Sequence, residues 1–216
     1  MAIVRAECNG FLEIRPDFLT GEALDTVFMR LSELVRVQTT GDIKPGVPCL
    51  LERPEIVVFM RTCRQQRDVG FFRVPPTADG MSVAPYEYSN QQALAQDMPD
   101  WLVELMESVN ADLGTSFNAV LVNHYADGSQ YISKHRDSEK GLVPKSPVAA
   151  ISVGATRTFR VREWPTGKKV ADVPMPDGSL LVMLGPFQKM YTHEVPIEKK
   201  IKGERYSITF REHKLV

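Results

Sequence analysis

The chain has few cysteines, no long apolar run and no excess of charge of one sign. Its three cysteines, Cys8, Cys49 and Cys63, form no Cys-x-x-Cys pair, which argues against a disulfide framework or a zinc knuckle. No stretch reaches the roughly 20 apolar residues of a membrane helix. The first 20 residues carry charges throughout and lack the apolar core of a signal peptide. We therefore expect a soluble intracellular protein, in the cytoplasm or the nucleus, with no membrane partner.

The balance of charge limits how the protein can bind nucleic acid. With 26 Lys and Arg residues against 27 Asp and Glu residues, the net charge is −1, so no whole-surface positive field is expected. Any nucleic-acid binding then depends on a local basic patch. Most basic side chains are ordinary solvated surface. Those available for phosphate contacts are Arg61, Arg64, Arg67, Lys168, Lys169, Lys199, Lys200 and Lys202.

The first half of the chain contains two helical patterns. Thr20 precedes an apolar stripe that predicts a helix over residues 21–35, including Val35. A second stripe predicts a helix over residues 99–113, with Gly114 as its C-cap. Residues 39–50 are rich in Gly and Pro and predict a loop. Residues 53–85 show no clear period, and we expect them to form a lid.

Short strands bounded by turn residues follow residue 116. The expected strands cover residues 117–125, 130–135, 148–154, 157–163, 179–184, 191–196 and 205–211. This order predicts an α+β fold: a double-stranded β-helix (jelly roll) core with N-terminal helices packed on one sheet. We expect residues 1–116 to be an N-terminal helical extension and residues 117–216 to be the jelly-roll core. Because no repeat or linker separates them, we expect one structural domain and a monomer.

Two histidines and an aspartate form a candidate metal site. His135 and Asp137 lie two residues apart, so in an extended strand they point to the same face, and His193 would join them from a neighbouring strand. This is the ligand set of a mononuclear Fe(II) site with open positions for a cosubstrate. Zinc accepts the same ligands, although a structural zinc site usually has a fourth Cys or His. Taken alone, a His-x-Asp pair is typical of a chance surface pair or a capped turn.

The last predicted strand carries two arginines. Arg205 and Arg211 are six residues apart and share one face with Ser207. A guanidinium is a planar, permanently charged partner for a carboxylate, so the pair suits a dicarboxylate. The alternative is a charge at the strand edge that faces solvent. The combination with the His-Asp-His pattern favours an oxygenase.

Several motifs in residues 117–211 match one known family in order and spacing. They are Asn123-His124-Tyr125-Ala126-Asp127-Gly128, His135-Arg136-Asp137-Ser138-Glu139, residues 152–159 (SVGATRTF), residues 177–183 (DGSLLVM) and residues 205–211 (RYSITFR). This region resembles the catalytic core of AlkB-type Fe(II)/2-oxoglutarate-dependent dioxygenases. These motifs are most similar to those of the members that repair alkylated DNA. Tyr86-Glu87-Tyr88-Ser89 resembles the segment that lines the base pocket in those members.

The resemblance implies a role for each matching residue. The implied iron ligands are His135, Asp137 and His193. The implied 2-oxoglutarate residues are Asn123, Tyr125, Arg205, Ser207 and Arg211, with Arg205 and Tyr125 at the distal carboxylate. Ser207 stands where the AlkB motif commonly has Asn. The implied substrate residues are Tyr86, Tyr88, Ser89 and Glu139, of which Glu139 would accept a hydrogen bond from an exocyclic amine. A solvated loop charge is the alternative for Glu139, and core packing is the alternative for the tyrosines.

The implied activity is oxidative demethylation of N-alkylated bases, of the 1-methyladenine and 3-methylcytosine type, in DNA or RNA. The reaction uses Fe(II), 2-oxoglutarate and O2, and it releases succinate and formaldehyde. Residues 1–116 would then include a nucleotide-recognition lid. A hydroxylase that acts on a protein or a small molecule is the alternative, because one iron core serves many substrates.

A preference for single-stranded or duplex nucleic acid depends on a projecting segment, called the finger, that duplex-acting relatives wedge into the base stack to expel the damaged base. These relatives have an apolar finger, whereas the corresponding stretch here, residues 39–42 (TTGD), is polar. Extrusion of a base costs less from a single strand. Single-stranded DNA or RNA is therefore at least as good a candidate as duplex.

Overall fold

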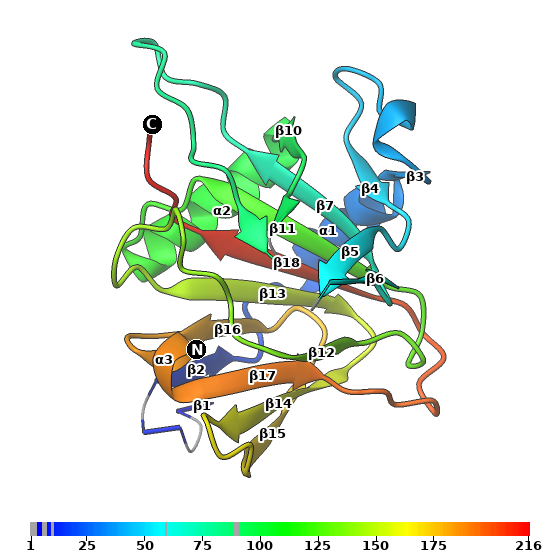
Figure 1. Cartoon of the computed structure of the whole chain (residues 1–216), viewed down its shortest axis with the longest axis vertical. Helices are drawn as coiled ribbons and strands as arrows, with labels where there is room; N and C mark the ends of the chain where they lie inside the picture. The colour runs from blue at the N-terminus through cyan, green and yellow to red at the C-terminus, as the bar shows by residue number, and fades with distance from the viewer. Residues whose placement is uncertain (1–3, 6–7, 10, 59, 89–90) are drawn as a thin grey trace.

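Two antiparallel-rich sheets dominate the computed structural model, which describes residues 4–5, 8–9, 11–58, 60–88 and 91–216 (Figure 1). The larger sheet has ten strands. In pairing order, nine of them are β1 (Val4–Arg5), β2 (Leu12–Arg15), β16 (Leu180–Met183), β13 (Val148–Gly154), β18 (Arg205–Arg211), β11 (Ala119–Tyr125), β7 (Asp68–Arg73), β4 (Cys49–Leu51) and β3 (Val35–Val37). The tenth, β10 (Ala95–Asp97), pairs in parallel with β7.

The smaller sheet has four strands and carries most of the metal-ligand motif. Its order is β12 (Ile132–His135), β17 (Tyr191–Val195), β14 (Arg157–Glu163) and β15 (Lys169–Met175). Two further two-stranded sheets are β5 (Glu55–Val58) with β6 (Arg61–Arg64), and β8 (Glu87–Tyr88) with β9 (Gln91–Gln92). The two main sheets form the two layers of a jelly roll, so the predicted fold class is confirmed.

Helices cover one face of the larger sheet. They are α1 (Gly21–Ser32) and α2 (Asp100–Leu113); the short helices α3 (Phe187–Met190) and η1 (Thr40–Asp42) lie elsewhere (Figure 1). Leu31 and Leu102 pack in one buried cluster with Val122 and Ile208, which come from the central strands. Because side chains alternate along a strand, the neighbouring Asn123 and Ser207 face the opposite side, toward the smaller sheet.

The second predicted helix and all seven predicted strands are confirmed. Gly114 caps α2 in the left-handed conformation, with a φ of 65°. The first helix was predicted three residues too long, because α1 ends at Ser32 and Val35 instead begins β3. There its backbone pairs with Cys49 of β4, and its side chain is 46% exposed. The predicted loop over residues 39–50 likewise contains η1 and the start of β4.

The first 116 residues contribute more strands than the sequence predicted. β2 pairs with β16, and β7 pairs with β11 over six residue pairs, from Ala119–Arg73 to His124–Asp68. The strand β15 was also missed. The division of the chain at residue 117 remains a prediction, but strands from both sides of it share one sheet. Among the described residues, no helix has the length and apolar character needed to cross a membrane.

Candidate active site

A cavity of about 550 Å³ lies between the two sheets and is also lined by the β5–β6 hairpin. Its walls combine side chains of the smaller sheet, such as His135 and His193, with side chains of the larger sheet, such as Asn123 and Arg205. Ile56 and Arg64 of the hairpin also line it. The fold therefore brings residues from three separate parts of the chain to one enclosed space.

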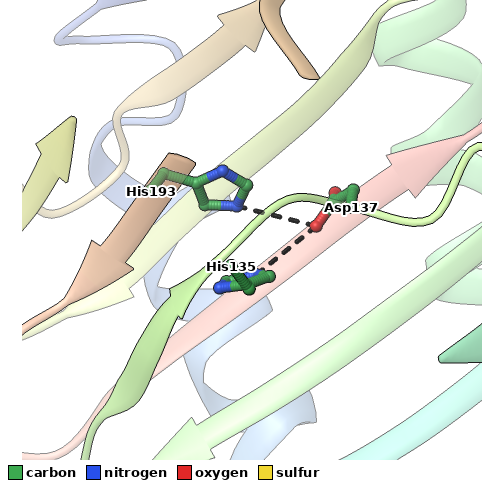
Figure 2. Close-up of side chains that lie close together, drawn as sticks. All are labelled: His135, Asp137 and His193. Carbon is green, nitrogen blue, oxygen red and sulfur yellow. Dashed lines mark ion pairs between the residues drawn. The ribbon is translucent and has the colours of Figure 1, made fainter. Parts of the chain in front are cut away.

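The predicted metal ligands meet at one end of this cavity. His135 ends β12 and is paired in register with His193 of β17, while Asp137 follows two residues after β12. Asp137 Oδ1 lies 3.4 Å from Nε2 of His135 and 3.6 Å from Nε2 of His193. Figure 2 shows both imidazole rings directed at the carboxylate. One candidate donor atom from each residue lies within 4.8 Å of the others.

The surroundings of the two histidines keep their Nε2 atoms available. His135 donates its Nδ1 hydrogen to the Ser133 carbonyl at 2.8 Å, which leaves the lone pair on Nε2. His193 is buried and stacks on Phe159, with ring centroids 5.1 Å apart. Burial, together with the nearby His135, lowers the pKa of His193. Both effects favour the neutral imidazole, which is the form that binds a metal.

Asp137 is buried and ionised. Arg211 Nη2 donates to Oδ2 of Asp137 at 2.6 Å, and the backbone N–H of Asp137 donates to Oε1 of Gln188 at 2.9 Å. Burial favours the neutral acid, but Arg211 and the two histidines outweigh it and hold the pKa of Asp137 well below its usual range. Because Arg211 occupies Oδ2, Oδ1 is the oxygen that faces the histidines.

This donor set fits Fe(II). Two neutral imidazoles and one carboxylate oxygen on one side of an ion form the facial arrangement of non-haem iron sites. No fourth His, Cys or acidic residue joins the cluster in the described part of the chain. A closed structural zinc site therefore fits less well.

Arg205 provides a positive charge deeper in the cavity. Its Nε donates to Oγ of Ser152 at 2.8 Å, and its buried Nη1 has no partner among the described residues. Burial, with help from nearby Arg157, lowers the pKa of Arg205 to about 10, so the group stays charged at neutral pH. A buried cation with an unused donor is unfavourable until an anion binds. The site therefore suits a carboxylate.

All five predicted cosubstrate residues line the cavity: Asn123, Tyr125, Arg205, Ser207 and Arg211. Asn123 is paired with Ser207, and Tyr125 with Arg205, on the neighbouring strands β11 and β18. The structure thus brings them together as the resemblance implied, while their individual roles remain predictions.

The predicted substrate residues divide into three groups. Tyr86 and Tyr88 line the cavity, with ring centroids 5.6 Å apart, and the Arg211 guanidinium lies 4.7 Å from the Tyr86 ring centroid. Ser89 lies outside the described residues. Glu139 is exposed and is not among the described side chains that line the cavity.

Two cavity residues were missed by the sequence analysis. Gln65 and Arg67 are buried and line the cavity, and Arg67 Nε donates to Oδ1 of Asn123 at 2.7 Å. The suggestion that Arg67 is a surface contact for phosphate is therefore wrong. Gln65 and Arg67 lie in the connection between β6 and β7, outside any strand, so the alternation of a strand gave no signal for them.

Comparisons with known proteins agree with this geometry. The sequence model of the 2OG-Fe(II) oxygenase superfamily matches residues 12–211. The chain belongs to this superfamily. The superfamily uses Fe(II), 2-oxoglutarate and O2. The relatives described next confirm the prediction that the chain is of the AlkB type.

Three relatives illustrate the similarity. Human DNA oxidative demethylase ALKBH2 is 38% identical over 117 residues, which cover 51% of this chain and 45% of the human protein. ALKBH2 of Arabidopsis thaliana is 29% identical over 182 residues, covering 74% and 57%. Alpha-ketoglutarate-dependent dioxygenase alkB homolog 3 of Rattus norvegicus is 33% identical over 138 residues, covering 59% and 46%. The matched segment spans about half the length of these curated relatives.

A solved structure supports the fold alone. OsALKBH1 superposes with a TM-score of 0.57, covering 94% of this chain and 97% of that chain, at 17% sequence identity.

Proposed function

We propose that this protein oxidatively demethylates N-alkylated bases in DNA or RNA. The observation that carries the proposal is one cavity that combines the His-Asp-His ligand set, Arg205 and the tyrosines Tyr86 and Tyr88. The similarity to proteins named DNA oxidative demethylase supports the same substrate class. The overall reaction consumes O2 and 2-oxoglutarate and yields succinate, CO2, formaldehyde and the unmodified base.

The side chains have distinct tasks in this proposal. His135, His193 and Asp137 would hold Fe(II), each through one donor atom. Iron and 2-oxoglutarate, when bound, supply the oxidation of the alkyl C–H bond. Arg205 orients the distal carboxylate of 2-oxoglutarate. Apolar side chains such as Phe159 line the same space and reduce the access of water. No protein general base is needed for this oxidation.

The entrance of the cavity suits a nucleic-acid strand. We propose that the protein acts mainly on single-stranded DNA or RNA, because extrusion of a base from a duplex costs more. Residues Thr40–Asp42 form η1 and are not among the described residues that line the cavity. The hairpin that does line it has an exposed turn residue, Met60, and the exposed Arg61 and Arg64 beside it. A monomeric state and a location in the cytoplasm or nucleus remain predictions.

One assay tests the proposal directly. Iron-loaded protein is incubated with 2-oxoglutarate, ascorbate and single-stranded or duplex oligonucleotides that carry one alkylated base. Succinate and the repaired base are then measured by mass spectrometry, with Asp137→Ala as the ligand-deficient control. We expect both products in matched amounts from the wild type and neither above background from the variant. Succinate without repair of any alkylated base would contradict the proposal and would favour the hydroxylase alternative.

A further inference from the structure

The cavity wall next to the tyrosines contains two polar side chains that the iron site does not use. Gln65 and Arg67 lie between the β5–β6 hairpin and β7, and they are only 4% and 9% exposed. Both line the cavity, as do Tyr86 and Tyr88. Buried polar groups are expensive unless they are paired, so the unpaired Oε1 of Gln65 and the buried charge of Arg67 indicate what binds beside them.

Arg67 brings a positive charge that no acidic group balances. It donates from Nε to Asn123, and no ion pair is recorded for it within the described part of the chain. The neighbouring Asp68 points to the other face of the sheet, where its Oδ2 meets Nδ1 of His124 at 2.8 Å. Asp137 is already paired with Arg211. The guanidinium of Arg67 therefore faces the cavity as an uncompensated hydrogen-bond donor.

Gln65 adds an acceptor next to this donor. Its Nε2 donates to the hydroxyl of Tyr88 at 3.3 Å, whereas its buried Oε1 has no partner among the described residues. The wall thus offers one strong donor and one free acceptor. This pattern complements a base edge in which a carbonyl oxygen and an amino group flank the alkylated nitrogen.

Both 1-methylguanine and 3-methylcytosine have such an edge, and charge separates them. 3-Methylcytosine is a cation, as is 1-methyladenine, which lacks the carbonyl, so the guanidinium of Arg67 repels both. 1-Methylguanine is neutral and offers both groups, whereas the neutral 3-methyluracil offers carbonyl oxygens but no amino group. The carboxylate expected to favour the cations, Glu139, is exposed and stands apart from the described cavity lining.

We propose that Gln65 and Arg67 read the edge of the substrate base and select neutral N-alkylated bases that carry a ring carbonyl beside the alkyl group, with 1-methylguanine as the best complement. This selection rests on the proposed demethylase function. Arg67 donates to the carbonyl oxygen, and Gln65 Oε1 accepts from the amino group. The tyrosines contribute the flanking aromatic surface.

The test compares pairs of lesions that differ in charge and in the groups beside the alkylated nitrogen. Single-stranded oligonucleotides carry 1-methylguanine or 1-methyladenine, and a second pair carries 3-methyluracil or 3-methylcytosine. We expect the wild type to prefer the neutral member of each pair in kcat/KM by about tenfold or more, the effect of one charge-assisted hydrogen bond. Arg67→Gln removes the charge but keeps a donor, and it should reduce this preference about tenfold. Gln65→Glu places a carboxylate beside Arg67 and should shift the preference toward the cations.

The same comparison is made without turnover. Dissociation constants of the four oligonucleotides are measured by fluorescence anisotropy with Mn(II) and N-oxalylglycine in place of iron and 2-oxoglutarate. Arg30→Gln is the matched control, because Arg30 is exposed on α1 and its loss should leave both ratios unchanged. Thermal unfolding establishes that each variant is folded, and Gln65→Glu provides an independent test if Arg67→Gln is not.

The outcomes separate the two proposals. A binding preference for neutral bases that is lost in Arg67→Gln supports the inference even when no base is repaired. The absence of repair would overturn only the proposed demethylase function. Repair of both members of each pair with equal efficiency overturns the inference and leaves the function intact. A wild-type preference for the cationic bases, or a preference that Arg67→Gln and Gln65→Glu leave unchanged, also overturns the inference.

Discussion

Arg205 illustrates how one buried charge defines a binding site. Its Nη1 is buried without a partner in the described structure, and no carboxylate pairs with it there. We expect Arg205→Ala to weaken 2-oxoglutarate binding about ten- to a hundredfold, the effect of losing a hydrogen bond to a charged group. The Kd of 2-oxoglutarate is measured by titration calorimetry. Arg160→Ala, which removes a half-buried arginine paired with Asp172, is the control, and an equal Kd in both variants would contradict the assignment.

Because of the buried His213, we expect the folded protein to be less stable in mild acid. It is buried against Phe71 and Tyr86, and neither ring nitrogen has a partner among the described residues. Burial, with the nearby Arg211, lowers its pKa from 6.5 to about 4. Between these values the unfolded chain binds a proton that the folded protein does not, so stability falls as the pH decreases from 6.5 to about 4. A shift of 2.5 units corresponds to about 3 kcal/mol.

The measurement is urea unfolding of the metal-free protein across this pH range. His213→Leu keeps an apolar side chain in the same place and should flatten the curve. Part of the slope should remain, because the pKa of His193 is also lowered. An equal slope in His213→Leu and the wild type would show that other groups cause the loss.

At the level of whole elements, hydrophobic periodicity predicted the second half of the chain well. The strands β11, β13 and β16 are buried along all or nearly all of their length and β14 alternates in burial, and turn residues separate them, whereas the more exposed β15 was missed. The His-x-Asp spacing indicated a shared metal site, although β12 ends at His135 and Asp137 lies two residues beyond it. The first half was harder to predict, because β3, β4 and β10 are only three residues long. Such strands depend on pairing with distant segments, and local sequence does not contain that information.

The same limitation explains the missed cavity residues. Arg67 lies in the connection between β6 and β7, and nothing in the local sequence distinguishes this buried arginine from the exposed Arg64. Glu139 shows the converse, because its spacing from Asp137 matched a family motif while its side chain lies in solvent. Motif spacing therefore identified the candidate metal ligands, but burial was needed to identify the side chains that surround them.

We expect a substitution in the turn of the β5–β6 hairpin to affect duplex substrates more than single-stranded ones. Met60 lies in its turn, is 96% exposed and has a φ of 63°. A large exposed apolar side chain on a hairpin that lines a cavity can insert between stacked bases. Under the proposed function, Met60→Ser should lower kcat/KM several-fold on duplex oligonucleotides while changing the single-strand rate little. Met29→Ser, at a 60% exposed position on α1, serves as the control. Equal losses on both substrates would argue against insertion.

At the scale of the whole molecule, the two halves of the chain complete one sheet. β7 and β2 each pair with a strand from beyond residue 117, and α2 packs in the same buried cluster as β11 and β18. We expect a fragment of residues 117–216 to lack cooperative unfolding, because it exposes strand edges and the apolar face beneath the helices. Thermal denaturation followed by circular dichroism tests this against the full chain. A cooperative transition in the fragment would show that the C-terminal half folds by itself.

The Gln65 and Arg67 part of the cavity wall comes from an earlier stretch of the chain than the candidate metal ligands. His135, Asp137, His193 and Arg205 all follow residue 117, whereas Gln65 and Arg67 precede it by some fifty residues. Under the two proposals, mutations in the earlier segment would alter which base is recognised and leave the candidate metal ligands in place. In evolutionary terms, such an arrangement allows a lineage to acquire new substrates by drift in one stretch of the gene while purifying selection maintains the chemistry encoded in the other.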